Sequence, residues 1–215
     1  MLLSIIRQNQ KLAAKRNPAF DRNRFAKFLI YFMVAFWAAY LIFIGVMLSF
    51  AFEDIFPSME PYHIMNQGLI YLLILDFLLR FMLQPAMSQE IKPYLLMPIK
   101  KNKLVDTLLL QSGISSYNFF WFFLIVPFAL LTIIRFYGFT GILCYLCGIW
   151  LLMAMNSYWY LICKTLLNEK LLYILLPIGV YGLLAGTEFI PEGNPVSTFM
   201  MNLGEGFIEG NILSF

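Results

Sequence analysis

The chain has 215 residues, of which 61% are hydrophobic and 13% are charged, against about 45–50% and about 25% in a typical soluble domain. A soluble fold of this size could not bury so much apolar surface, so the composition excludes a soluble enzyme, a disordered protein and a secreted scaffold. One His and three Cys are also too few for a disulfide framework or a zinc module. The class indicated is a membrane protein with several spans.

The first predicted element, residues 1–27, mixes apolar and basic side chains. Ile6 and Leu12 can share one helical face, while Arg7 and Lys11 lie toward the other. Such a basic amphipathic helix would lie in the cytoplasmic interface of the membrane and lead into the first span. A plain juxtamembrane anchor that sets the topology explains the same residues equally well.

Long uncharged runs predict five membrane-spanning helices, because about 20 apolar residues cross roughly 30 Å of hydrocarbon. Helix is the only state expected, since unpaired backbone groups cannot face lipid. The predicted spans are about 28–52, 68–87, 117–134, 142–163 and 171–187. The sequence therefore predicts an all-α polytopic helix bundle whose sixth span is missing or incomplete. The remaining segment, 188–215, is expected to be an external tail or a re-entrant segment.

Small residues recur at four-residue spacing in the first and fifth spans, as Ala35 with Ala39 and Gly182 with Gly186. Such pairs let helices approach each other closely. They predict helix packing, either within one subunit or at the seam of a dimer.

The second span carries the only charges predicted to lie deep in the membrane, Asp76 and Arg80. A lone charge at that depth costs about 2.5–3.5 kcal/mol on insertion scales, so the two side chains, one helical turn apart, are expected to pair. Two interpretations stay open. The pair is either a gate at the cytoplasmic end of a translocation path or a structural ion pair that fixes the second span.

The connection between the second and third spans predicts a cytoplasmic coupling segment over residues 88–103. Ser88 can cap a short helix there, and Pro98 can close it. An exposed aromatic and two Leu rimmed by lysines are typical of a docking surface for a partner protein. An amphipathic loop that lies on anionic headgroups is the alternative. The residues expected to make the contact are Tyr94, Leu95, Leu96, Pro98, Lys100 and Lys101.

Two further patterns in the third and fourth spans favour packing over chemistry. The aromatic run 119–123 is expected to face lipid or the membrane interface. Cys144 and Cys147 have CxxC spacing but lie inside the fourth span, without solvent access or further ligands. The single His, His63, lies in the first outer loop. These two cysteines and Cys163 are expected to be inert, and no metal site or cofactor is predicted.

Charge asymmetry predicts that the N-terminus is cytoplasmic. With five spans, all Lys and Arg residues except Arg80 and Arg135 then fall in inner segments. The outer segments instead carry most of the acids: Glu53, Asp54, Glu60, Glu188, Glu192, Glu205 and Glu209.

The run Leu95-Leu96-Met97-Pro98-Ile99-Lys100, followed by Leu104, resembles the Leu-Leu-x-Pro-apolar-basic segment of ABC-2-type transporter permeases. In that family the segment forms the cytoplasmic helix between spans two and three that contacts the ATPase subunit. An interfacial helix before span one is a family feature. So are short re-entrant helices after span five, to which Phe189-Ile190-Pro191 and Asn194-Pro195 are loosely similar. The chain is more closely similar to uncharacterised bacteroidetes-type membrane proteins regarded as ABC-2-like permeases. The missing sixth span departs from this pattern and suggests a truncated chain.

The resemblance implies a permease subunit in a bacterial inner (cytoplasmic) membrane, surrounded by lipid and paired as a homo- or heterodimer. A separate P-loop ATPase would supply the work, since this chain has no Gly-x-x-x-x-Gly-Lys-Ser/Thr loop, His-Glu-x-x-His or Gly-x-Ser-x-Gly motif. The chain itself is then no enzyme. Its basic residues are too dispersed for a nucleic-acid groove. The rival functions are a membrane scaffold or assembly factor without transport, and a lipid-modifying enzyme that would need a polar cluster at one depth.

Overall fold

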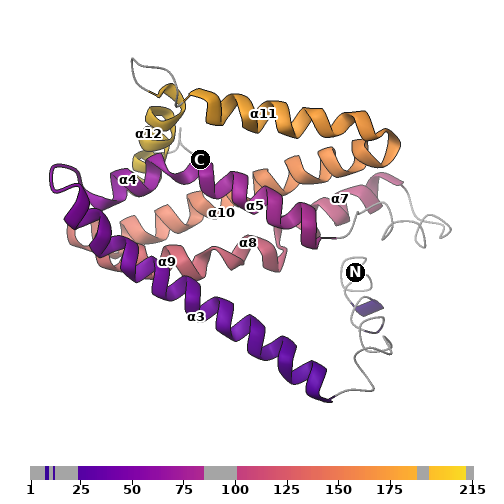
Figure 1. The fold of residues 1–215 in the computed structure, drawn as a ribbon, viewed down its shortest axis with the longest axis horizontal. Helices are drawn as coiled ribbons and strands as arrows, with labels where there is room; N and C mark the ends of the chain where they lie inside the picture. Colours follow the sequence, from indigo (N-terminus) through magenta and orange to yellow (C-terminus); the bar gives the residue numbers. More distant parts are fainter. Residues whose placement is uncertain (1–7, 10–11, 13–23, 85–100, 188–193, 212–215) are drawn as a thin grey trace.

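The computed structural model describes residues 24–84, 101–187 and 194–211, together with 8, 9 and 12. Every regular element in these ranges is helical, which confirms the predicted all-helical fold for this part of the chain (Figure 1). The elements are α3 (Arg24–Ile55), α4 (Pro61–Gln67), α5 (Leu69–Leu83), α7 (Lys101–Gly113), α8 (Ser116–Phe120), α9 (Phe122–Thr132), α10 (Ile134–Glu169), the 3₁₀ helix η2 (Leu171–Ile174), α11 (Leu175–Gly186) and α12 (Pro195–Glu209).

Among the described residues, two helices are long and apolar enough to cross a membrane by themselves, α3 from Lys27 to Ile55 and the whole of α10. Two bent helix pairs raise the number of candidate spans to four if each pair counts as one. The first pair is α4 with α5, and the second joins α7 and α8 to α9. α11 is apolar but shorter. The chain thus has the helices expected of a membrane protein.

Bends at three of the breaks between or within the described helices set their course. α4 and α5 meet at Gly68 with a bend of 48°, and the helices on either side of Trp121 are bent by 62°. α10 contains a kink at Gly138, where φ is 64° and ψ is −164°. Glycine reaches such a backbone conformation without the steric cost that a Cβ would add. The kink therefore depends on that residue type.

The core lies between α9 and α10. Ile125, Phe128 and Ile149 are fully buried there. α3 crosses α9 at Gly45, where a Cβ would lie 2.2 Å from the carbonyl oxygen of Leu124. The absence of a side chain at Gly45 therefore permits the close contact of these two helices.

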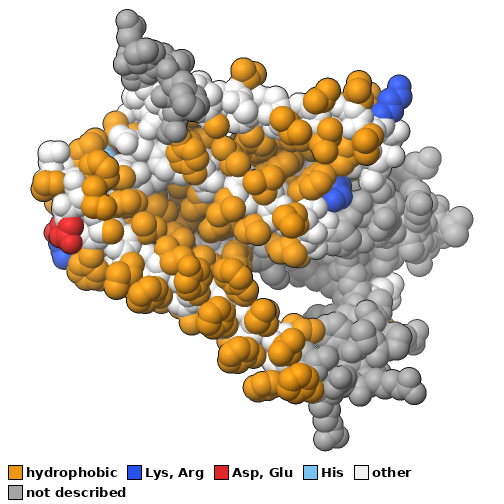
Figure 2. Space-filling view, in the orientation of Figure 1, with side chains coloured by type: hydrophobic (Ala, Val, Ile, Leu, Met, Phe, Trp, Pro, Cys, Tyr) orange, Lys and Arg blue, Asp and Glu red, His pale blue; other side chains and the backbone are white. Residues whose placement is uncertain are grey.

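The first half of α3 and nearly all of α11 lie outside this core. Along α3, Phe28, Phe32, Phe36 and Tyr40 stack on one another at four-residue spacing, and all four are exposed. In α11 only Pro177 is buried. Figure 2 shows apolar side chains over most of the visible face, with the few charged ones toward its two ends. This distribution matches a surface that meets lipid.

α12 is a well-capped helix that packs against the bundle. The side chain of Asn194 accepts hydrogen bonds from the backbone N–H groups of Val196 and Ser197, and Pro195 takes the first helical position. Gly210 ends the helix in the left-handed conformation with φ 72°. The part of the predicted tail that the structure describes is therefore a folded helix in contact with α4 and α10.

The predicted boundaries differ from the structure mainly after the second span. Residues 101–103, the last of the predicted coupling segment, begin α7, which continues to Gly113 and has no Pro or Gly to break it before that residue. α8 begins at Ser116, close to the predicted residue 117. The amphipathic helix predicted for 1–27 lies almost entirely outside the described residues.

Candidate functional site

Asp76 and Arg80 form an ion pair inside the bundle. Arg80 Nε donates to Asp76 Oδ2 at 2.7 Å, across one turn of α5. Arg80 is fully buried, and Asp76 is 3% exposed. Taking two charges into such a site is costly unless other polar groups satisfy them as well.

Both carboxylate oxygens of Asp76 accept further hydrogen bonds. The indole Nε1 of Trp121 donates to Oδ1 at 2.8 Å, and Nδ2 of Asn156 donates to Oδ2 at 2.8 Å. Trp121 lies at the break between α8 and α9, so this break aims its indole at α5. The prediction that the whole aromatic run 119–123 faces lipid or the interface is wrong for Trp121, which is 4% exposed.

Arg80 reaches a second helix break through Asn118. Arg80 Nη2 donates to Asn118 Oδ1 at 2.7 Å. Nδ2 of Asn118 donates in turn to the carbonyl oxygens of Ser112 at 3.1 Å and Gly113 at 2.5 Å, at the end of α7. The last carbonyls of a helix have no partner within it. The Asn118 amide supplies that partner, which explains how the chain breaks inside an apolar bundle.

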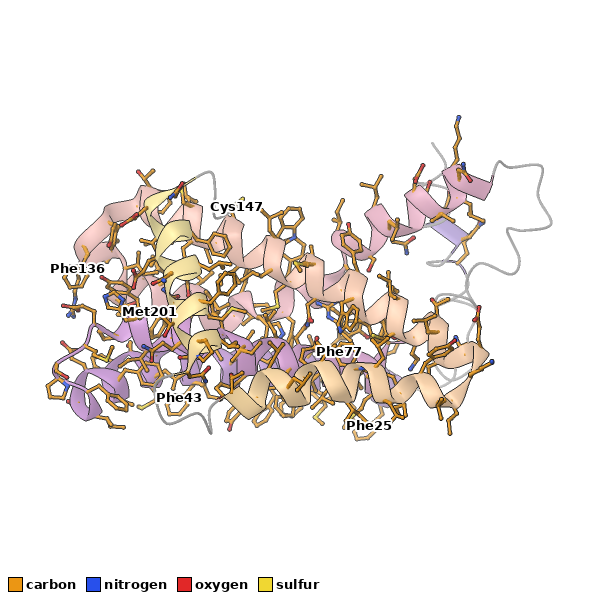
Figure 3. The ribbon with its side chains drawn as sticks, turned by 90° about the horizontal axis from the view of Figure 1, so that it is seen from above. Phe25, Phe43, Phe77, Phe136, Cys147 and Met201 are labelled. Atoms are coloured by element: carbon orange, nitrogen blue, oxygen red, sulfur yellow. The ribbon has the colours of Figure 1, made fainter. Side chains whose placement is uncertain are left out.

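Asn156 connects the network to α11. Its Nδ2 also donates to the carbonyl of Leu73 at 3.0 Å, and its Oδ1 accepts from the hydroxyl of Tyr181 at 2.6 Å. The ring of Phe77 packs against Tyr181 with ring centroids 4.9 Å apart, near the label in Figure 3. This hydrogen bond is one of the few polar links between α11 and the bundle. The polar network of the bundle consists of Asp76, Arg80, Asn118, Trp121, Asn156 and Tyr181.

One nitrogen of Arg80, Nη1, has no hydrogen-bond partner in the part of the chain that the structure describes, although the guanidinium carbon lies 6.0 Å from the centroid of the Tyr117 ring. Among the described residues the network therefore holds a charge that is neutralised by one carboxylate but is not fully hydrogen-bonded. A buried arrangement of this kind is sensitive to any movement of its partners.

The end of α5 is tied to α10 by two more bonds. The hydroxyl of Tyr160 donates to the carbonyl of Gln84 at 2.7 Å, and Lys164 Nζ donates to the carbonyl of Phe81 at 3.0 Å. Lys164 also lies 4.2 Å from the centroid of the Phe81 ring. These contacts satisfy helix-terminal carbonyls and fix the point where the chain enters residues 85–100.

The predicted coupling residues mostly lie beyond this point. Tyr94, Leu95, Leu96, Pro98 and Lys100 are outside the described residues, and Lys101 is the first residue of α7. α7 is itself fixed to α10, because the hydroxyls of Ser112 and Ser157 are 2.7 Å apart.

The small-residue pairs do not meet within the chain. Ala35 and Ala39 are exposed on α3, and a methyl group added at Gly182 or Gly186 of α11 would meet no described atom within 4 Å. The two helices lie on opposite sides of the bundle (Figure 1). Among the described residues these two pairs do not pack against each other, and the choice between packing within one subunit and packing at a dimer seam stays a prediction.

The other chemistry-bearing residues form no metal site among the described residues, where no group of three His, Cys, Asp or Glu could hold an ion. Cys144, Cys147 and Cys163 are free. His63 Nδ1 lies 2.5 Å from Glu205 Oε1 and joins α4 to α12 at the end opposite the polar network.

Sequence reasoning missed four members of the network: Asn118, Trp121, Asn156 and Tyr181. Asn118 and Asn156 did carry a signal, because an amide in an uncharged apolar run needs a partner in the bundle. Which partner it finds depends on the packing of helices far apart in the sequence.

Residues 10–215 match the model of DUF5687, a family of unknown function, and the chain belongs to this family. No curated protein and no solved structure matches the chain.

Proposed function

We propose that this protein is the membrane subunit of an ABC-2-type transporter, driven by a separate ATPase that binds the connection between α5 and α7. The observation that carries the proposal is how the helices beside that connection are attached to α10. The α5 end of that connection is fixed to α10 by Tyr160 and Lys164, and α7, which follows the connection, is fixed to α10 by the bond between Ser112 and Ser157 about three turns further on. A force applied to the connection would reach Arg80 and Asp76 within about two turns of α5.

The proposed topology has five spans with a cytoplasmic N-terminus in a bacterial inner membrane. Its support is the lysine distribution, which puts the connection and the end of α10 on the positive side. α4 with α5 would be the second crossing, α8 with α9 the third, and η2 with α11 the fifth. Asp76 then lies in the cytoplasmic third, since it is about 10 Å from the end of α5 at Leu83.

The network in this proposal is a closed lock. It joins α5 to the α7–α8 break, to the α8–α9 break, to α10 and to α11, and its charged groups are sealed from solvent. The sealed state also argues against a lipid-modifying enzyme, because no oxygen of Asp76 is free to act on a substrate.

The first experiment tests the ATPase. The full chain should co-purify in mild detergent with a P-loop ATPase, and Leu95→Asp or Leu96→Asp should remove it. Leu171→Asp, at an exposed site on η2, is the matched control and should retain the partner. A chain that recovers no ATPase, with or without these changes, would support the scaffold instead.

The second experiment separates the lock from a structural pair. Replacing both charges, Asp76→Leu with Arg80→Met, removes them without leaving one unpaired, and such swaps are often neutral or stabilising. We expect a folded protein that still binds the ATPase but whose ATP hydrolysis no longer responds to transport substrates. Unchanged coupling in the double variant would make the pair structural and would leave the ATPase interaction in place.

A further inference from the structure

A groove of about 460 Å³ lies between α7, α10 and α12. Its lining includes Leu110 of α7, Ile114 directly after that helix, Trp150 and Met155 of α10, and Leu203 of α12. Cavities of about 300–1,000 Å³ are the usual size for small-molecule sites. In Figure 3, Cys147 and α7 lie on the side of α10 opposite α11.

The groove opens to lipid rather than to water. Met155 on its wall is 71% exposed, and the neighbouring exposed residues of α10, Leu143 and Ile162, are also apolar. A concave apolar surface at this depth in a bilayer is filled by hydrocarbon, since water has no polar partners there. The chemistry of the lining therefore fits an acyl chain.

Positive charge lies on α7 beyond one end of the groove. Lys103 precedes Leu110 by seven residues, which is two turns and about 10 Å along the same face of α7. Lys103 is exposed, and Lys100 and Lys101 precede it, against a single acid, Asp106, in the next turn. Basic residues beside a membrane attract anionic headgroups by about 1 kcal/mol each. The apolar groove and the positive charge beyond it are thus arranged to complement the acyl chain and the negative headgroup of an anionic phospholipid.

We infer that this groove binds one anionic glycerophospholipid, with its headgroup at Lys103 and an acyl chain between α7, α10 and α12. The lipid would fill the space beside Gly113, where α7 breaks and Asn118 holds the broken end. Because Tyr158 also lines the groove and a Cβ at Gly113 would lie 2.7 Å from its hydroxyl, the chain approaches α10 closely at this point. This site rests on the orientation proposed above but not on transport.

Trp150 provides the readout. The full chain is reconstituted in two kinds of phosphatidylcholine vesicle. One kind contains a small fraction of phosphatidylglycerol with brominated acyl chains, and the other contains the same fraction of phosphatidylcholine with brominated acyl chains. Bromine quenches nearby tryptophan, so brominated phosphatidylglycerol should quench the fluorescence more strongly. The difference should vanish in Trp150→Phe, which leaves the other tryptophans in place.

Matched variants locate the lipid. Ile114→Phe fills the groove from an exposed position and should abolish the preference for phosphatidylglycerol, whereas Leu109→Phe, exposed on α7 outside the groove, should leave it intact. Lys103→Gln should weaken the preference about fivefold, and Lys170→Gln should not change it. Thermal unfolding checks that each variant folds. If Ile114→Phe does not fold, Lys103→Gln still decides the test, because it changes an exposed side chain.

Two results would overturn the site. Equal quenching by both brominated lipids, unaffected by Ile114→Phe, means ordinary boundary lipid. Absence of quenching at Trp150 by either lipid means that polypeptide covers the groove. Neither result bears on the ATPase proposal, whose test uses Leu95 and Leu96.

Discussion

The two ends of the bundle are held together by different kinds of contact. At the α12 end, helices meet through glycines: a Cβ at Gly148 would lie 2.2 Å from the ring of Phe207, and a Cβ at Gly204 would lie 2.3 Å from the Asn66 amide. At the network end, helices meet through the hydrogen bonds of Asp76 and Arg80. Among helices in lipid, where burying apolar surface gains little, close packing and hydrogen bonds are the two available forces. One end therefore tolerates no added volume, and the other tolerates no missing partner.

The largest effect is expected from breaking the ion pair on one side. Asp76→Leu leaves the fully buried Arg80 charge uncompensated, which should lower the free energy of unfolding by about 3–5 kcal/mol. Thermal unfolding in detergent would measure the loss. A variant as stable as the unmodified protein would show that Arg80 reaches water or another carboxylate.

Added volume tests the α12 end. Gly148→Leu should force α12 away from α10, because the Phe207 ring occupies the space, and should cost about 1–3 kcal/mol. Gly179→Leu is the matched control, since a Cβ there meets no described atom within 4 Å. Equal unfolding temperatures for the two variants would contradict the close contact.

A smaller effect is expected where α11 joins the network. Tyr181→Phe removes the hydroxyl that donates to Asn156, and one such bond contributes about 0.5–1.5 kcal/mol. Tyr173→Phe, in η2, changes the same chemistry at an exposed site. Hydrogen exchange of α11 should rise in the first variant only. An equal rise in both would mean that Tyr181 does not hold α11.

The smallest effect is expected at the His63–Glu205 pair. Each side chain is more than a quarter exposed, and exposed ion pairs contribute about 0–1 kcal/mol. His63→Gln should therefore shift the unfolding temperature little, and less than Gly148→Leu does at the same end. A larger loss than that of Gly148→Leu would mean that charge rather than packing holds α12.

Much of the helical layout follows from the sequence, because uncharged apolar runs have one stable form in lipid. The run 28–52 lies within α3, and 142–163 lies within α10. The spacing of Asp76 and Arg80 also indicates their pairing, since i and i+4 share a helix face.

The rest depends on contacts that sequence spacing does not encode. The break after Gly113 is stabilised by Asn118, and the role of Trp121 depends on the bend that aims it at Asp76. Local propensity gives no sign of either partner. The fold of α12 is equally hidden, because its glycines are typical of a loop until the Asn66 side chain that packs on Gly204 is known.

The length of α10 has a consequence for the bilayer that this protein fits. Between Arg135 and Lys164 the helix has no charged residue, and these 28 positions rise about 42 Å, against about 30 Å of hydrocarbon. The kink at Gly138 removes only the first turn from this length. Either the rest of the helix must tilt or the surrounding bilayer must thicken, at a cost of a fraction of a kcal/mol for each ångström of mismatch. The protein should accordingly be most stable in membranes with long acyl chains.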